Sequence, residues 1–186
     1  MSKMKIAFIV DHFPSVTQTF ILNQITGVLE KGHDVVIFTK RLSEDVEVHE
    51  EIESYQLLLR TVSIGCLSDE MPLNKFFRVI KGVFYLFRYV WTYPVPILKS
   101  LNIWRYGKKA VSLSLLYQIV ATLKWGGFDI IHCQFGTLGL DALFLREFGA
   151  LKGKLVVAFR GFDATQYIQS NPGIYDDLFQ KGDLFM

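Results

Sequence analysis

Short apolar runs alternate with helical repeats from the start of the chain. Residues 5–10 form a continuous apolar run with β-branched members, which is typical of a strand buried on both faces. Residues 17–31 carry apolar side chains three and four positions apart and are followed by Gly32, so the pattern predicts a helix that ends at this glycine. A second apolar run lies at 34–39. A strand, a helix and a strand in this order predict a βαβ unit and therefore a parallel sheet.

The rest of the chain continues this alternation less regularly. The polar, acidic stretch at 40–53 predicts a surface loop or short helix, and the apolar run at 57–64 predicts a third strand. Further along, the pattern predicts helices at 110–125, 138–148 and 175–180, and strands at 129–133, 155–159 and 183–186. Because the last strand has only begun at Met186, we expect the sequence to be truncated.

An apolar and aromatic stretch at 73–93 is hydrophobic enough to suggest a membrane helix, but four basic residues interrupt it. A spanning helix needs about 20 mostly uncharged residues, so we predict no transmembrane segment there. We interpret residues 73–109 as a helical, basic and aromatic insertion. The predicted architecture for residues 1–186 is an α/β, Rossmann-like domain with a parallel sheet and helices on both faces.

The composition supports a folded domain. Hydrophobic residues make up 51% of the chain and charged residues 20%, which excludes a disordered or low-complexity protein. The two cysteines, Cys66 and Cys133, are too few for a disulfide framework and fit no metal-ligand spacing. The first residues lead directly into a predicted strand, so we expect no cleavable leader. We therefore expect a reducing, cytoplasmic location, with peripheral attachment to the inner face of the membrane as a further possibility.

The basic residues are concentrated in the middle of the chain. Between Met71 and Phe128 there is no Asp or Glu, and the nine basic residues there are Lys75, Arg78, Lys81, Arg88, Lys99, Arg105, Lys108, Lys109 and Lys124. The remaining residues are net negative, although the whole chain carries +2. Such a block favours contact with an anionic membrane surface, a polyanion or a phosphorylated ligand. The alternative is a helical insertion whose Lys and Arg side chains are ordinary solvated ends.

Aromatic residues accompany the basic ones within 73–109. Aromatic faces with basic flanks suit a lipid interface, and the candidates for membrane contact are Arg78, Lys81, Arg88 and Trp91. The alternative is that these aromatic side chains pack inward, against the helix predicted at 110–125 and against the sheet.

Three polar loops follow predicted strands, which is where ligands bind in parallel α/β sheets. They span residues 11–19, 132–139 and 160–165. Helix N-termini in such loops attract anions, and Gly136 and Gly139 would let a ligand approach the backbone closely. The sequence contains no Gly-x-Gly-x-x-Gly in the first loop, no Ser-His-Asp or paired-carboxylate arrangement and no metal-binding cluster. We therefore name no catalytic residue and expect no metal.

Each candidate in these loops also has a purely structural interpretation. Asp163 or Thr165 can serve as a helix N-cap. His132 can be a satisfied polar group at a strand end, and Arg160 can pair with Asp163 and do nothing else. Cys133 is interpreted as a small buried hydrophobic residue.

Several segments resemble the N-terminal half of glycosyltransferase family 4 enzymes, especially those of the colanic acid and exopolysaccharide type. The segments are Phe13-Pro14, residues 17–25, Gly32-His33-Asp34-Val35, Arg105-Tyr106-Gly107, residues 129–136, Phe159-Arg160-Gly161-Phe162-Asp163 and residues 178–184. They follow the family's order over nearly the whole chain.

This resemblance implies the N-terminal half of a GT-B fold, in which two Rossmann-like domains face a cleft. The N-terminal domain mainly receives the acceptor, and a C-terminal domain, absent from this chain, holds the nucleotide-sugar and carries a Glu-x(7)-Glu signature. The family usually retains anomeric configuration and needs no bound metal. The implied function is sugar transfer from a nucleotide-sugar to a polysaccharide or lipid-linked oligosaccharide, with this fragment inactive alone and no nucleic acid as partner. The alternatives are a non-catalytic module that binds a sugar or phosphate, and a membrane-surface adaptor.

The candidate cleft residues come from the three loops. They are Pro14, Ser15, Thr17, Gln18, Thr19, His132, Gln134, Gly136, Arg160, Gly161 and Asp163. Two positions depart from the family's pattern. Thr17-Gln18 stands where relatives often have Glu after a Ser, so a charged role there is not expected. Arg160 stands where many relatives have His; because Arg keeps its charge and offers a planar donor fork, it suits a phosphate or carboxylate better than proton transfer.

Overall fold

A six-stranded parallel sheet forms the centre of the computed structural model, which describes residues 2–15, 18–43, 50–64 and 71–186. The strand order is β3-β2-β1-β4-β5-β6. The bounds are β1 Lys5–Phe13, β2 Asp34–Leu42, β3 Thr61–Ser63, β4 Ile130–Cys133, β5 Lys154–Val157 and β6 Leu184–Phe185. All neighbouring strands are parallel, so the predicted parallel arrangement of β2, β1, β4 and β5 is confirmed.

Some strand ends differ from the sequence prediction because long-range contacts set them. β1 continues to Phe13, which is buried and pairs with the end of β2. The chain then turns at a cis peptide bond to Pro14. β3 is shorter than predicted, since a 3-10 turn at Leu57–Arg60 precedes it. The buried Leu57 side chain anchors this turn, and the Thr61 hydroxyl donates to the Leu57 carbonyl at 2.8 Å.

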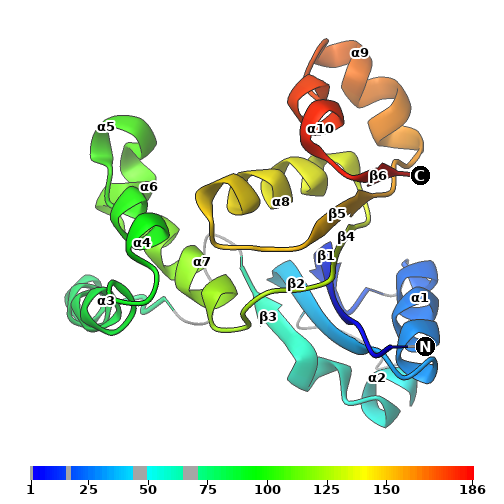
Figure 1. Cartoon of the computed structure of the whole chain (residues 1–186), viewed down its shortest axis with the longest axis horizontal. Helices are drawn as coiled ribbons and strands as arrows, with labels where there is room; N and C mark the ends of the chain where they lie inside the picture. The colour runs from blue at the N-terminus through cyan, green and yellow to red at the C-terminus, as the bar shows by residue number, and fades with distance from the viewer. Residues whose placement is uncertain (1, 16–17, 44–49, 65–70) are drawn as a thin grey trace.

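Helices cover both faces of the sheet (Figure 1). One layer contains α1 Thr19–Glu30 and α2 Glu50–Ser54, and the other contains α7 Ser114–Leu123 and α8 Gly136–Phe148. The side chains of neighbouring β1 residues pack alternately into the two helix layers. Phe8 packs in the layer of α1, and Ile9 packs in the layer of α7 and α8. Because both layers are apolar, the strands are continuous apolar runs without the alternation of a one-sided sheet.

Four helices occupy residues 75–111, mostly within the segment predicted as an insertion, and they gather at the end of the molecule opposite α1 (Figure 1). They are α3 Lys75–Tyr89, α4 Pro94–Ser100, α5 Ile103–Tyr106 and α6 Lys108–Val111. α3 docks on α7: the Tyr85 and Tyr117 rings lie 5.6 Å apart, and the Tyr117 hydroxyl donates to the Arg78 carbonyl at 2.7 Å. Over the described residues, no helix has the length and hydrophobicity to cross a membrane.

The helix predicted at 110–125 is divided into α6 and α7. Between them Leu113 has a left-handed φ of 59°. The hydroxyls of Ser112 and Ser114 lie 3.0 Å apart, and both donate to the Lys109 carbonyl. Serine hydroxyls that bond to nearby backbone compete with continued helix, which explains the break.

The C-terminal part alternates helices and strands as predicted. α8 begins at Gly136 and ends before Gly149, whose φ of 85° is the left-handed conformation expected after a helix. A π-helical turn at Asp163–Tyr167 and α9, Ile168–Ser170, follow β5. α10, Asp176–Lys181, then leads into β6.

Candidate functional site

The loops after β1, β4 and β5 leave the sheet at its carboxyl edge, because all three strands are parallel. Two of these loops touch directly, since the Asp163 carboxylate accepts a hydrogen bond from the Gly136 amide at 3.0 Å. The start of α1 joins them, because the Arg160 guanidinium lies over the Phe20 ring, 4.4 Å from its centroid. The structure therefore brings together residues that lie far apart in the sequence.

Gln134 is the centre of a polar cluster at this edge. Its side chain is fully buried, and its Nε2 donates to Gln24 Oε1 of α1 at 2.8 Å. The same Nε2 lies 3.1 Å from His132 Nδ1, and Gln134 Oε1 accepts from Arg160 Nη2 at 3.4 Å. We call Gln24, His132, Gln134 and Arg160 the polar cluster.

His132 contributes a neutral imidazole to the polar cluster. Burial lowers its pKa below the ordinary value, and the positive charge of Arg160 lowers this pKa further. Because Nδ1 faces the Gln134 amide nitrogen, Nδ1 accepts a hydrogen bond and Nε2 carries the proton. The ring packs against Phe8, with centroids 5.1 Å apart. His132 is therefore a hydrogen-bond donor at Nε2.

Arg160 keeps hydrogen-bonding capacity in this arrangement. Its Nε atom is buried and has no hydrogen-bond partner within the described part of the chain. Asp163 bonds to other groups, so the interpretation of a simple Arg160–Asp163 pair is wrong. A guanidinium with an unpaired donor beside an aromatic ring suits a phosphate or carboxylate.

Asp163 ties the loop after β5 to the start of α8. Its side chain is 1% exposed; Oδ2 accepts from the Gly136 amide, and Oδ1 accepts from the Tyr175 hydroxyl at 3.3 Å. A carboxylate is favourable at a helix N-terminus, where the first amides are unpaired. Burial, and then the nearby Asp163 charge, raise the pKa of Tyr175, which stays a donor. Asp163 thus caps α8 and not its own helical turn, while the Thr165 hydroxyl bonds back to the Gly161 carbonyl.

Gly136 and Gly139 are needed for packing, and the expectation that a ligand approaches their backbone stays a prediction. A Cβ at Gly136 would lie 2.5 Å from Phe159 Cε1 and 2.8 Å from Tyr175 Cζ. A Cβ at Gly139 would lie 2.9 Å from both methyl groups of Val157. Protein atoms therefore fill the space on the Cβ side of each glycine.

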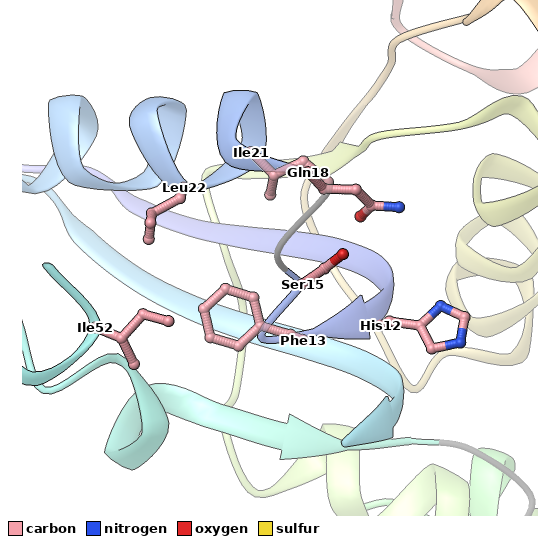
Figure 2. Close-up of a pocket in the computed structure, with 7 residues that line it drawn as sticks. All are labelled: His12, Phe13, Ser15, Gln18, Ile21, Leu22 and Ile52. Atoms are coloured by element: carbon pink, nitrogen blue, oxygen red, sulfur yellow. The ribbon is translucent and has the colours of Figure 1, made fainter. Parts of the chain in front are cut away.

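The loop after β1 lines a small pocket between β1 and α1 (Figure 2). The pocket is lined by His12, Phe13, Ser15, Gln18, Ile21, Leu22 and Ile52. In Figure 2 the polar ends of His12, Ser15 and Gln18 lie toward one side, and the apolar side chains of Phe13, Leu22 and Ile52 toward the other. Gln18 Oε1 is buried without a hydrogen-bond partner among the described residues, so it is available to a donor.

The remaining loop candidates differ in exposure. Pro14 is buried, whereas Thr19, the first residue of α1, and Gly161 are exposed. Thr17 and Cys66 lie outside the described residues. Cys133 is buried as predicted, and burial raises the pKa of its thiol.

Phe20 and Gln24 belong to the site although the sequence analysis does not name them as candidates. They are four positions apart and therefore lie on one face of α1. The sequence signal that could have identified them is a polar Gln one helical turn after an aromatic residue, within the segment 17–25 that resembles the family.

The four residues predicted to contact a membrane differ in exposure. Arg88 and Trp91 are exposed. Arg78 is half-buried and its guanidinium donates to two preceding backbone carbonyls. Lys81 is half-buried, with its ammonium 5.4 Å from the centroid of the Tyr85 ring. Arg78 and Lys81 therefore make contacts within this helical segment, and contact of any of the four residues with a membrane stays a prediction.

Curated proteins similar to this chain are named as exopolysaccharide glycosyltransferases. The chain is 31% identical to the colanic acid biosynthesis glycosyltransferase WcaL of Salmonella typhimurium and 28% identical to that of Escherichia coli. It is 30% identical to the amylovoran biosynthesis glycosyltransferase AmsK of Erwinia amylovora. Each match covers 98% of this chain but 44% of the relative, so the chain spans less than half the length of these proteins. No protein-family model matches the chain. The resemblance to exopolysaccharide glycosyltransferases is confirmed.

Proposed function

We propose that this chain is the acceptor-binding part of a retaining glycosyltransferase, which transfers a sugar from a nucleotide-sugar to a polysaccharide or a lipid-linked oligosaccharide. The named activity of the relatives supports the reaction class. The polar cluster supports the position of the acceptor site, because ligands of parallel α/β sheets bind at the carboxyl edge of the sheet. The observation that carries the proposal is Arg160, whose buried Nε has no hydrogen-bond partner among the described residues and which lies next to the neutral His132.

Each member of the polar cluster has a distinct task in this proposal. Arg160 binds a substrate phosphate or carboxylate, since its planar fork matches these groups. His132 donates from Nε2 to a substrate oxygen. Gln134 and Gln24 hold both side chains in position, because the buried Gln134 amide contacts Gln24, His132 and Arg160.

The donor side of the reaction is assigned to the part of a longer protein that this chain does not cover. The relatives are more than twice as long as the matched region, which leaves room for a second domain that binds the nucleotide-sugar. A lipid-linked acceptor is held at a membrane, so we place the protein in the cytoplasm at the inner membrane face. We assign no cofactor or metal to this part.

Binding of a soluble lipid diphosphate tests the role of Arg160. Isopentenyl diphosphate is titrated into the 186-residue chain and into Arg160→Gln, with binding followed by calorimetry. A charge-assisted hydrogen bond contributes about 1.5–3 kcal/mol, so Arg160→Gln is expected to weaken binding by roughly tenfold or more. Arg105→Gln, an exposed cation on α5, is the matched control and should bind like the unmodified chain. Equal binding by Arg160→Gln, or none by the unmodified chain, overturns the assignment.

A further inference from the structure

The outward face of α3 is a continuous apolar surface. Seven side chains form this α3 face, each at least 43% exposed: Phe76, Phe77, Val79, Ile80, Val83, Phe84 and Phe87. At 100° per residue they occupy one uninterrupted arc, with the buried Gly82 and Tyr85 on the opposite side of the helix. A surface helix of a globular domain normally points its polar residues outward. Here no polar side chain lies within the exposed arc.

The aromatic residues of the insertion separate into inward and outward groups. Tyr85 is buried, and Tyr89 and Tyr93 are half-buried against the core of the α7 and α8 layer. Phe87 and Trp91, by contrast, are 71% and 86% exposed. Packing against the core therefore accounts for the apolar surface of the tyrosines. It does not account for the exposed phenylalanines and Trp91, which need another partner.

The charged residues of α3 itself are all basic. Lys75 at its beginning and Arg88 near its end are exposed, and no Asp or Glu occurs between Met71 and Phe128. Two copies that met through this face would bring like charges together, which disfavours a dimer there. An apolar helix face with basic residues at both ends is complementary to an anionic surface that also offers hydrocarbon.

The position of α3 leaves this face open. In Figure 1 α3 lies at one end of the molecule, and β6 with the C-terminus lies toward the opposite end. α7 packs on the inward side of α3 and does not cover its outward arc. The α3 face is therefore accessible to a large flat partner.

We propose that the α3 face binds an anionic lipid bilayer, with α3 lying parallel to the membrane plane. Phe76, Phe87 and Trp91 would enter the boundary between headgroups and acyl chains, and Lys75 and Arg88 would contact lipid phosphates. The α-helix has 15 residues, which is too short to span the hydrocarbon core. The inference deepens the proposed placement at the membrane by naming the surface that binds it, and it requires no sugar transfer.

Vesicle co-sedimentation of the 186-residue chain tests this surface, with phosphatidylcholine vesicles that contain or lack phosphatidylglycerol. The chain is expected to pellet with anionic vesicles and to be released by salt, because contacts to lipid phosphates are screened. Phe76→Ser/Phe87→Ser and Lys75→Gln/Arg88→Gln should each reduce binding by about tenfold, because one removes apolar contacts and the other removes phosphate contacts. These side chains are exposed, so circular dichroism should show an unchanged fold.

The matched control is Leu58→Ser/Leu59→Ser, which removes two exposed apolar side chains from the 3-10 turn before β3 and should bind like the unmodified chain. Insertion has its own readout: with Trp104 and Trp125 replaced by Phe, emission of Trp91 should shift to the blue on anionic vesicles. Three results would each overturn the inference. The first is equal pelleting on both lipids, and the second is full binding by Phe76→Ser/Phe87→Ser. The third is a dimer that forms without lipid and that the same variant dissociates. None of these results depends on glycosyltransferase activity.

Discussion

Gln134 shows how partners distant in sequence decide the role of a single residue. Its amide joins Gln24 of α1, His132 of β4 and Arg160 after β5. A buried primary amide is costly unless its donors and acceptor are paired, and these three contacts pair them. Because the Gln134 amide contacts both His132 and Arg160, loss of Gln134 should disturb the positions of these two side chains.

The imidazole of His132 predicts a specific pH dependence of stability. Its pKa in the folded protein lies below the unfolded value of about 6.5, so the unfolded chain binds more protons in this range. The stabilising contribution is therefore full above about pH 6.5 and is lost as pH falls toward the folded pKa. In His132→Gln, the urea midpoint should fall less between neutral and mildly acidic pH than in the unmodified chain.

Thr19→Ala is the control for this measurement, because it changes an exposed, non-titrating side chain at the start of α1 and leaves His132 in place. Its midpoint should follow the unmodified chain across the pH series. An unchanged pH slope in His132→Gln would show that His132 does not carry this dependence.

At the scale of the element, glycines set how closely helices approach the sheet and its neighbours. α8 rests against β5 and α10 because Gly139 leaves room for Val157 and Leu178. Its first residue, Gly136, leaves room for the rings of Phe159 and Tyr175. The start of α8 is therefore fixed by packing and by the Asp163 cap together.

Gly136→Ala and Gly27→Ala form a matched pair that tests this packing. A Cβ at Gly136 would lie 2.5 Å from Phe159, and such overpacking costs about 1–3 kcal/mol of unfolding free energy. A Cβ at Gly27, inside α1, meets no atom within 4 Å and should stabilise the helix by about 0.5–1 kcal/mol. Urea denaturation should thus give midpoint shifts of opposite sign, and a neutral Gly136→Ala would contradict the packing role.

On the scale of the whole molecule, two surfaces with different chemistry lie on different parts of the fold. The polar cluster lies at the carboxyl edge of the sheet, next to α1. The α3 face belongs to the insertion, at the end of the molecule opposite α1 (Figure 1). The proposed substrate site and the proposed membrane surface can therefore be altered independently.

The proposed division of the cleft predicts that the 186-residue chain transfers no sugar by itself. Transfer requires donor and acceptor to be held together, and this orientation supplies much of the rate acceleration. A radiolabelled nucleotide-sugar assay with membrane extract as acceptor should give no product, and calorimetry should show weak nucleotide-sugar binding at most. Robust turnover would refute the division between acceptor and donor parts.

Local patterns allowed the fold class to be predicted from the sequence. The apolar runs at 5–10 and 34–39, with a helix between them, required burial on both faces and a crossover, which only a parallel sheet provides. Gly149 marked the end of α8, because a left-handed residue is easily formed by glycine. The positions of the three carboxyl-edge loops followed from this topology.

The sequence by itself determined the order of the strands and of the helices α1, α8 and α10, the burial of the strands and the basic, aromatic character of the insertion, because these depend on periodicity and composition. Tertiary structure alone decided which polar groups pair and which aromatic side chains face solvent. Asp163 caps α8 and not its own turn, because its partner Gly136 belongs to another element. Arg160 Nε has no hydrogen-bond partner within the described part of the chain. The sequence places the tyrosines and phenylalanines of α3 side by side, but only the docking of α3 on α7 turns one set inward and exposes the other.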